Sequence, residues 1–253
     1  MRFASLGSGS KGNGTLVASA TTRVLIDCGF TLKDAERRLA RMGIEAGQLA
    51  AILVTHEHGD HLGGVGRLAR RHGVPVYLTH GTARSWRDAD GVEVRRFDPD
   101  HAFDVGDLHV EPFAVPHDAA QPCQFRLSHQ GRQFGVVSDL GHVTPHVVSH
   151  LQACDALLLE CNHDVAMLAD GPYPFSLKRR VGGHFGHLSN LQAASLLRQL
   201  DRSRLQHLIL THLSEVNNTP QLARGAILEV LEEDPEWCRC ADQSEGMAWC
   251  EVA

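Results

Sequence analysis

The chain has 253 residues, of which 43% are hydrophobic, and carries a formal net charge of −6 with a pI of about 6.3. This length allows a large core, and no Ser/Gly/Pro-rich linker or charge block divides the sequence, so we expect one domain over residues 1–253. The negative charge argues against a wholly basic nucleic-acid-binding protein but is compatible with a local basic groove. No apolar run is long enough for a signal peptide or a membrane span, so we expect no membrane contact.

Short apolar runs alternate with helical patterns along the chain. We expect strands at 23–26, 51–55 and 155–159, short β-like runs from 74 to 137, and helices at 31–42, 62–72, 191–200 and 221–232. This order predicts an α/β (α+β) fold in which helices cover stacked sheets. Residues 52–56 (ILVTH) resemble residues 208–212 (LILTH), which suggests two similar halves that each deliver a histidine from a strand end.

The cysteine count is odd: seven thiols are scattered along the chain. This is a poor disulfide framework and fits a reducing compartment, so we expect a cytoplasmic protein. Cys238 and Cys240 form a C-x-C pair without a second pair at zinc spacing, and we interpret them as ordinary thiols.

The most informative motif follows the expected strand at 51–55 and reads His56-Glu57-His58-Gly59-Asp60-His61. Residues two apart in extended backbone point the same way, so His56, His58 and Asp60 share a side, and His61 joins them as the chain turns into a helix. Imidazole and carboxylate ligands suit zinc, iron or manganese. Four such groups in six residues exceed what one ion needs from one loop, which suggests two ions.

Four further candidates follow other short apolar runs: Asp27, His117, Asp139 and His212. A single strand-end His or Asp is more often structural. Together, however, they are typical of a site that several strand ends build jointly.

Residues 7–12 match G-x-G-x-x-G, but a strand pattern follows where a dinucleotide site needs a helix. We interpret the segment as a hairpin loop, with a backbone nest that binds phosphate near Ser10 as the alternative.

A late helix begins with a predicted capping box of Ser189 and Gln192, which places His187 beside a helix N-terminus that favours anions. The alternative is a polar capping loop. The basic run at 178–180 is usually a solvated face, but beside an anion site Lys178 and its neighbours could hold a phosphate backbone.

At these positions the sequence resembles the metallo-β-lactamase superfamily, whose five motifs match in order at Asp27, the 56–61 cluster, His117, Asp139 and His212. The resemblance implies a four-layer αββα sandwich. It also implies that one ion takes His56, His58 and His117, that the other takes Asp60, His61 and His212, that Asp139 bridges them, and that Asp27 supports the site without ligating.

Finer features resemble the YycJ (WalJ) branch of that superfamily. They are Gly7-Ser8-Gly9-Ser10-Lys11-Gly12-Asn13, Pro116-His117-Asp118-Ala119, Asn162-His163-Asp164, Gly171-Pro172-Tyr173-Pro174, Gly186-His187-Leu188-Ser189-Asn190 and His212-Leu213-Ser214-Glu215-Val216-Asn217-Asn218. That branch implies 5′-to-3′ exonuclease activity on DNA.

We therefore expect a hydrolase with two divalent ions, zinc first and manganese or iron as alternatives, that cleaves phosphodiesters in DNA or else in a small molecule. Its expected catalytic residues are Asp60, Asp139 and His187, with His187 as proton donor to the leaving oxygen. Expected substrate contacts are Ser10, Asn162, Lys178, Ser189 and Asn217. The alternatives are a hydrolase of cyclic phosphodiesters, thioesters or lactones, and a non-catalytic metal-bearing DNA-binding or regulatory module. The sequence gives no oligomeric state.

Overall fold

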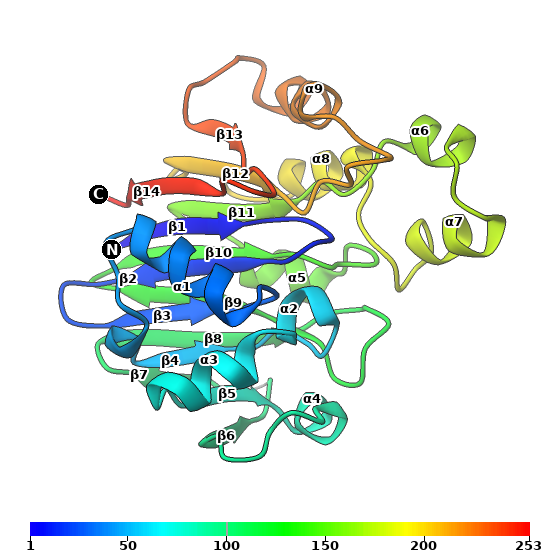
Figure 1. The fold of residues 1–253 in the computed structure, drawn as a ribbon. Helices are drawn as coiled ribbons and strands as arrows, with labels where there is room; N and C mark the ends of the chain where they lie inside the picture. Colours follow the sequence, from blue (N-terminus) through cyan, green and yellow to red (C-terminus); the bar gives the residue numbers. More distant parts are fainter. Residues whose placement is uncertain (100) are drawn as a thin grey trace.

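A computed structural model describes residues 1–99 and 101–253, and its strands form two seven-stranded sheets (Figure 1). The first sheet has the order β14 (Met247–Glu251), β1 (Arg2–Gly7), β2 (Gly14–Ala18), β3 (Arg23–Ile26), β4 (Ala51–Leu53), β5 (Val76–Thr79) and β6 (Val94–Phe97). The second has the order β13 (Cys238–Cys240), β12 (His207–Thr211), β11 (Ala156–Glu160), β10 (Arg132–Val137), β9 (Cys123–His129), β8 (Leu108–Ala114) and β7 (Phe103–Val105).

Helices cover the outer face of each sheet. The first half contains α1 (Leu32–Arg41), the 3₁₀ helix η1 (Ala46–Gln48), α2 (Gly59–Leu62), α3 (Val65–His72) and α4 (His80–Ser85). The second contains α5 (Pro145–His150), α6 (Val165–Asp170), α7 (Phe175–Val181), α8 (Asn190–Arg198) and α9 (Pro220–Leu231). One apolar cluster lies between the sheets, a second joins the first sheet to α1 and α3, and a third joins the second sheet to α5, α8 and α9. The predicted four-layer αββα sandwich is confirmed.

The two sheets repeat one pairing scheme. In the first, antiparallel pairs run from β14 through β1 and β2 to β3, and parallel pairs continue through β4 and β5 to β6. In the second, antiparallel pairs run from β7 to β10 and parallel pairs from β10 to β13. By this scheme β3 corresponds to β10, and β4 corresponds to β11.

The expectation of two similar halves is therefore correct, but the sequence echo paired the wrong strands. The strand before His56 is β4, whereas the strand before His212 is β12, which corresponds to β5. Similar apolar composition produced that echo, because all of these strands are buried.

The observed elements follow the predicted ones with two main differences. The helix expected at 62–72 begins only at Val65, as α3, and Gly63 and Gly64 separate it from the short α2; a side chain on residue 64 would meet the backbone oxygen of Phe30. Residues 163–187 also leave the second sheet as an excursion that contains α6 and α7, neither of which was expected. Within the described residues, no helix is long and apolar enough to cross a membrane.

Candidate metal centre

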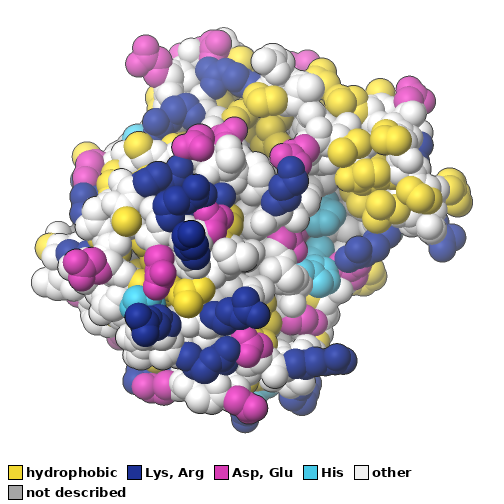
Figure 2. Space-filling model, viewed as in Figure 1, with side chains coloured by type: hydrophobic (Ala, Val, Ile, Leu, Met, Phe, Trp, Pro, Cys, Tyr) yellow, Lys and Arg dark blue, Asp and Glu magenta, His cyan; other side chains and the backbone are white. Residues whose placement is uncertain are grey.

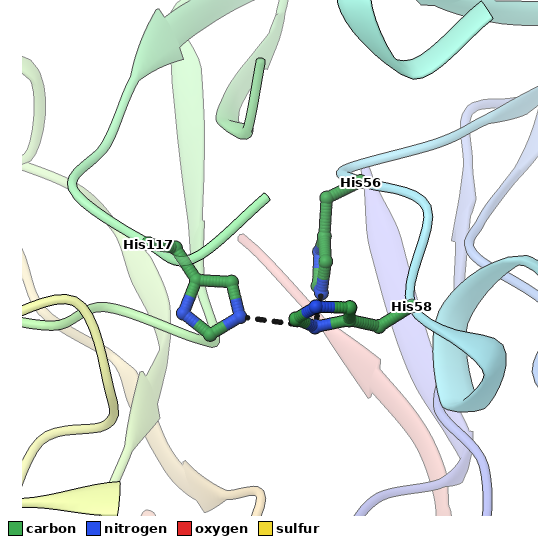
Figure 3. A group of neighbouring side chains, drawn as sticks. All are labelled: His56, His58 and His117. Carbon is green, nitrogen blue, oxygen red and sulfur yellow. Dashed lines mark hydrogen bonds between the residues drawn. The ribbon is translucent and has the colours of Figure 1, made fainter. Parts of the chain in front are cut away.

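Three histidines converge at one end of the sheets: His56 and His58 follow β4, and His117 follows β8 (Figure 3). The Nδ1 atom of His58 lies 3.1 Å from His56 Nε2 and 3.2 Å from His117 Nε2. Nitrogen ligands at tetrahedral angles, each about 2.0–2.1 Å from zinc, lie about 3.3 Å from one another. These three nitrogens are therefore spaced as one metal ion requires.

A second triad lies beside the first and consists of Asp60, His61 and His212. Asp60 Oδ2 lies 3.4 Å from the Nε2 atoms of both His61 and His212. Asp139 adjoins both triads. Its carboxylate lies 2.6 Å from Nε2 of His61 in the second triad, and its ligand atom lies within 4.8 Å of those of His61 and of His56 in the first triad. Among the described residues, two groups have the same members as the triads that the resemblance implies, and a further group joins Asp139 to Glu160, His187 and His212.

Hydrogen bonds behind the triads fix the ring orientations. Asp27 accepts from Thr55 N and Thr55 Oγ1 and lies 2.8 Å from His61 Nδ1. Gly186 O lies 3.0 Å from His117 Nδ1. Each contact occupies Nδ1 and leaves Nε2 free to ligate, which is the usual arrangement behind metal-binding histidines. Asp27 itself belongs to none of the ligand groups, in keeping with a supporting role.

Glu160 is the buried carboxylate that the sequence analysis missed. It ends β11 and is 0% exposed. Its Oε1 atom lies 2.8 Å from His187 Nδ1 and 3.2 Å from His212 Nδ1, and its Oε2 atom accepts from the amides of Leu140 and Leu188. The available signal was a charged residue at the end of an apolar strand, the same signal that marks Asp27 and Asp139.

His187 lies against both triads. Its Nδ1 atom lies 3.0 Å from Asp139 Oδ1, and its ring centroid lies 5.3 Å from that of His117 and 5.2 Å from that of His212. Burial acts to lower the pKa of His187, but the carboxylates of Glu160 and Asp139 outweigh it and raise the pKa to about 9. The imidazole is therefore a cation at neutral pH in this arrangement.

The donor set fits divalent cations. Among the described residues, Asp27, Asp60, Asp139 and Glu160 form no ion pair with Lys or Arg, only with imidazoles. Buried carboxylates need a compensating charge. In addition, the buried Nε2 atom of His212 has no hydrogen-bond partner although it faces Asp60. Two cations held by the two triads would satisfy both requirements.

The expected substrate-contacting residues differ in how exposed they are to solvent. Ser10 is exposed, and Lys178 donates to Ala169 O within the α6–α7 excursion. Asn162, Ser189 and Asn217 are at most 4% exposed. Asn162 donates to the backbone oxygen of His212, and Ser189 caps α8 with the predicted capping box.

The glycine-rich loop at 8–13 is a hairpin loop between β1 and β2, as predicted. Its amides are largely satisfied within the protein: Gly9 N donates to the Asn13 side chain and Lys11 N donates to Gln243. The loop residues that reach the site are Ser8, which accepts from His212 N, and Asn13, which contacts Asp60 and His61. Sequence reasoning selected Ser10 instead.

The basic run contributes Arg180 to the rim of the site. Its Nε atom donates to Asp118 Oδ2 at 2.5 Å, and Asp118 Oδ1 lies 3.4 Å from His117 Nε2. Figure 2 shows histidine side chains at the surface beside the hydrophobic surface of the α6–α7 excursion, with basic and acidic side chains around them. The surroundings of the triads are thus of mixed charge.

Comparisons with known proteins agree with this geometry. A family model described as a β-lactamase superfamily domain matches residues 22–213. The chain is 35% identical to Exodeoxyribonuclease YycJ of Bacillus anthracis, covering 92% of this chain and 90% of that one. It is 32% identical to Exodeoxyribonuclease WalJ of Streptococcus pneumoniae, with coverages of 92% and 88%.

Among solved structures, the metallo-β-lactamase fold protein YhfI of Bacillus subtilis matches with a TM-score of 0.78 at 18% identity, over 99% of each chain. At that identity the likeness concerns the fold alone. The fold, the motifs and the relatives confirm the sequence resemblance, and the chain belongs to the β-lactamase superfamily, in the branch that contains YycJ and WalJ.

Proposed function

We propose that this protein is an exonuclease that hydrolyses phosphodiester bonds in DNA with the help of two divalent metal ions. The observation that carries the proposal is the position of His187: its imidazole lies against both triads, held by two carboxylates. Cleaving a phosphodiester expels an alkoxide, which needs a proton, whereas a thioester has a better leaving group. A positioned acid at this place therefore favours phosphodiesters.

His56, His58 and His117 would hold one ion, Asp60, His61 and His212 the other, and Asp139 would contact both. The ions would supply a water molecule that ionises near neutral pH and positive charge for the phosphate oxygens. We propose zinc as the metal, with manganese or iron as the alternatives.

The protein's own side chains would do the remaining work. His187 would donate its proton to the leaving oxygen, and Glu160 and Asp139 keep the ring oriented through Nδ1 so that Nε2 is the free donor. Asp60 would bind the ion of the second triad, and Asp139 would contact the ions of both triads. At the rim, Arg180 would exchange its ion pair with Asp118 for a phosphate oxygen, a group that guanidinium binds well.

DNA is proposed as the substrate because the two relatives described above are named exodeoxyribonucleases. We also propose a cytoplasmic location, on the ground that seven cysteines are an odd number for a disulfide framework.

The test is a substrate panel: end-labelled DNA, bis-p-nitrophenyl phosphate, a thioester and a lactone, each with the wild type and with Asp139→Ala. We expect stepwise shortening of DNA by the wild type and none by the variant. Turnover of the thioester or lactone without cleavage of DNA would contradict the proposal. Metal binding without turnover of any substrate would favour a regulatory module.

A further inference from the structure

Phe185 is an exposed aromatic residue on the loop that leads from α7 to His187. Its side chain is 59% exposed, although burial of a phenylalanine is favourable. Single exposed hydrophobic residues are common on protein surfaces. What distinguishes Phe185 is the way its backbone is attached to the metal centre.

The backbone around Phe185 is tied to two of the loops that bring candidate ligands from the second sheet, those of His117 and Asp139. Phe185 O accepts from Asp118 N at 3.0 Å, next to the ligand His117, and the following carbonyl, that of Gly186, contacts His117 Nδ1. On the other side, a side chain at Gly141 would lie 2.1 Å from His184 O and 2.6 Å from Phe185 Cα. The loop therefore packs directly on the segment that follows Asp139.

A guanidinium is anchored to the residue that binds the Phe185 backbone. Asp118 donates its amide to Phe185 O and accepts from Arg180 through its carboxylate. The backbone that carries an exposed aromatic ring and a cation are thus both bound to Asp118, the residue after the candidate ligand His117. A nucleotide offers the complementary pair, a flat base and an anionic phosphate.

We propose that Phe185 stacks on an unpaired nucleobase of the DNA strand, next to the phosphate that is being cut. The inference rests on the proposed exonuclease function and extends it, since it assigns the base contact and makes a frayed or single-stranded end the form that is bound. Stacking of a base on an aromatic side chain tolerates any sequence, as an exonuclease requires.

A nucleobase fits the surroundings of Phe185 better than an apolar protein surface does. The residues next to its backbone are polar or charged. His184 precedes it in the chain and its ring lies edge to face with that of His142 at 5.4 Å, and Arg180 pairs with Asp118, which donates to Phe185 O. Phe175 offers a contrast within the same excursion. It is 79% exposed but begins α7, about 10 Å of helix away from the loop.

The experiment measures kcat and KM for end-labelled single-stranded oligonucleotides with Phe185→Ala, Phe185→Leu and Phe185→Trp, and with Phe175→Ala as the matched control. We expect Phe185→Ala to raise KM by about 5- to 150-fold, the range for loss of one stacked base. Phe185→Trp should keep a low KM because it retains an aromatic face. Phe185→Leu should resemble Ala, because its bulk is apolar but not aromatic, and Phe175→Ala should match the wild type.

A second arm replaces single bases by abasic sites along the oligonucleotide. At one position near the cut end, the abasic site should raise KM for the wild type and change nothing for Phe185→Ala. A wild-type KM for Phe185→Leu, or a change of oligomeric state with Phe185→Ala in sedimentation, would overturn the stacking contact in favour of an apolar interface. Failure of the wild type to cut any oligonucleotide would instead overturn the proposed function itself.

Discussion

Asp27 and Asp139 occupy equivalent positions in the two sheets. Asp27 follows β3 and Asp139 lies just beyond β10, which are the corresponding first parallel strands, and each is followed two residues later by glycine. Both adopt left-handed backbone, with φ of 59° and 51°. They contact opposite nitrogens of one ring: Asp27 lies at His61 Nδ1 and Asp139 at His61 Nε2. The same local structure thus supplies a residue that orients a candidate ligand histidine in the first sheet, and a candidate metal ligand in the second sheet.

This equivalence makes the two residues matched controls for each other. Asp139→Ala should remove metal and abolish hydrolysis, because its carboxylate lies between the triads. Asp27→Ala should keep most of the metal but lower kcat by about 10- to 100-fold, the usual effect of removing a group behind a ligand. Elemental analysis with steady-state kinetics checks both, and equal metal loss in the two variants would make Asp27 a ligand.

Metal removal should destabilise the protein. We expect close to two transition-metal ions per chain as purified. Chelation should lower Tm and resupply should restore it, because a ligand at 100 times its Kd stabilises by about 2.7 kcal/mol per site. Calorimetry before and after treatment measures this. A chain without metal, whose Tm does not respond to added zinc or manganese, would refute the two-ion site.

His187→Ala should keep both metals and reduce turnover of DNA by about 10²- to 10⁴-fold, the range for a positioned general acid. The loss should be smaller for bis-p-nitrophenyl phosphate, because p-nitrophenolate leaves with little protonation. Comparing kcat on the two substrates is the measurement. Equal losses would make His187 a phosphate-binding residue only, and no loss would leave it with a structural role.

Glu160→Gln should weaken the site and the fold together. All four contacts of Glu160 come from nitrogen groups, so a glutamine amide would place a donor against donors. We expect a loss of about 1–3 kcal/mol in unfolding free energy and about 10- to 100-fold in kcat. Glu57→Gln is the control, because Glu57 lies within the histidine cluster yet accepts hydrogen bonds from Ala120 and Thr82, outside both triads. Similar damage in both variants would argue against a special role for Glu160.

Gly141→Ala should destabilise the protein by about 1–3 kcal/mol, because the new methyl group would lie 2.1 Å from His184 O. It should also lower hydrolysis, since the displaced loop carries His187. Gly47→Ala is the control, because nothing lies within 4 Å of its added carbon. Denaturant unfolding compares the two, and equal stability would show that the 183–187 loop moves freely.

The sequence predicted those parts of the site that are local in the chain. The 56–61 cluster follows a buried strand, so the period of extended backbone was enough to bring His56 and His58 together. Glu160 was missed because it was read as the end of an apolar strand, and its role depends on His187 and His212, which are 27 and 52 residues away. Such pairings come from the parallel order of β10, β11 and β12, which periodicity does not reveal.

Most strands and the longer helices followed from apolar periodicity, whereas β13, β14 and the short helices α4, α5, α6 and α7 did not. In α7 no residue is buried, so it carries no apolar stripe to detect. In the glycine-rich loop, Ser8 and Asn13 reach the site and Ser10 does not, because Gly7, Gly9 and Gly12 all take positive φ and redirect the chain. Those angles depend on contacts with Gln243, more than 200 residues away.

Three site residues, Asp27, Asp139 and His212, adopt left-handed backbone. Each such conformation costs about 1–3 kcal/mol in a residue other than glycine, although Asp and His tolerate it better than most. Glycine at these positions would relieve that strain and also remove a buried polar group. Directed evolution toward heat resistance alone would therefore enrich substitutions that abolish hydrolysis. A screen on this protein has to select for turnover and melting temperature together.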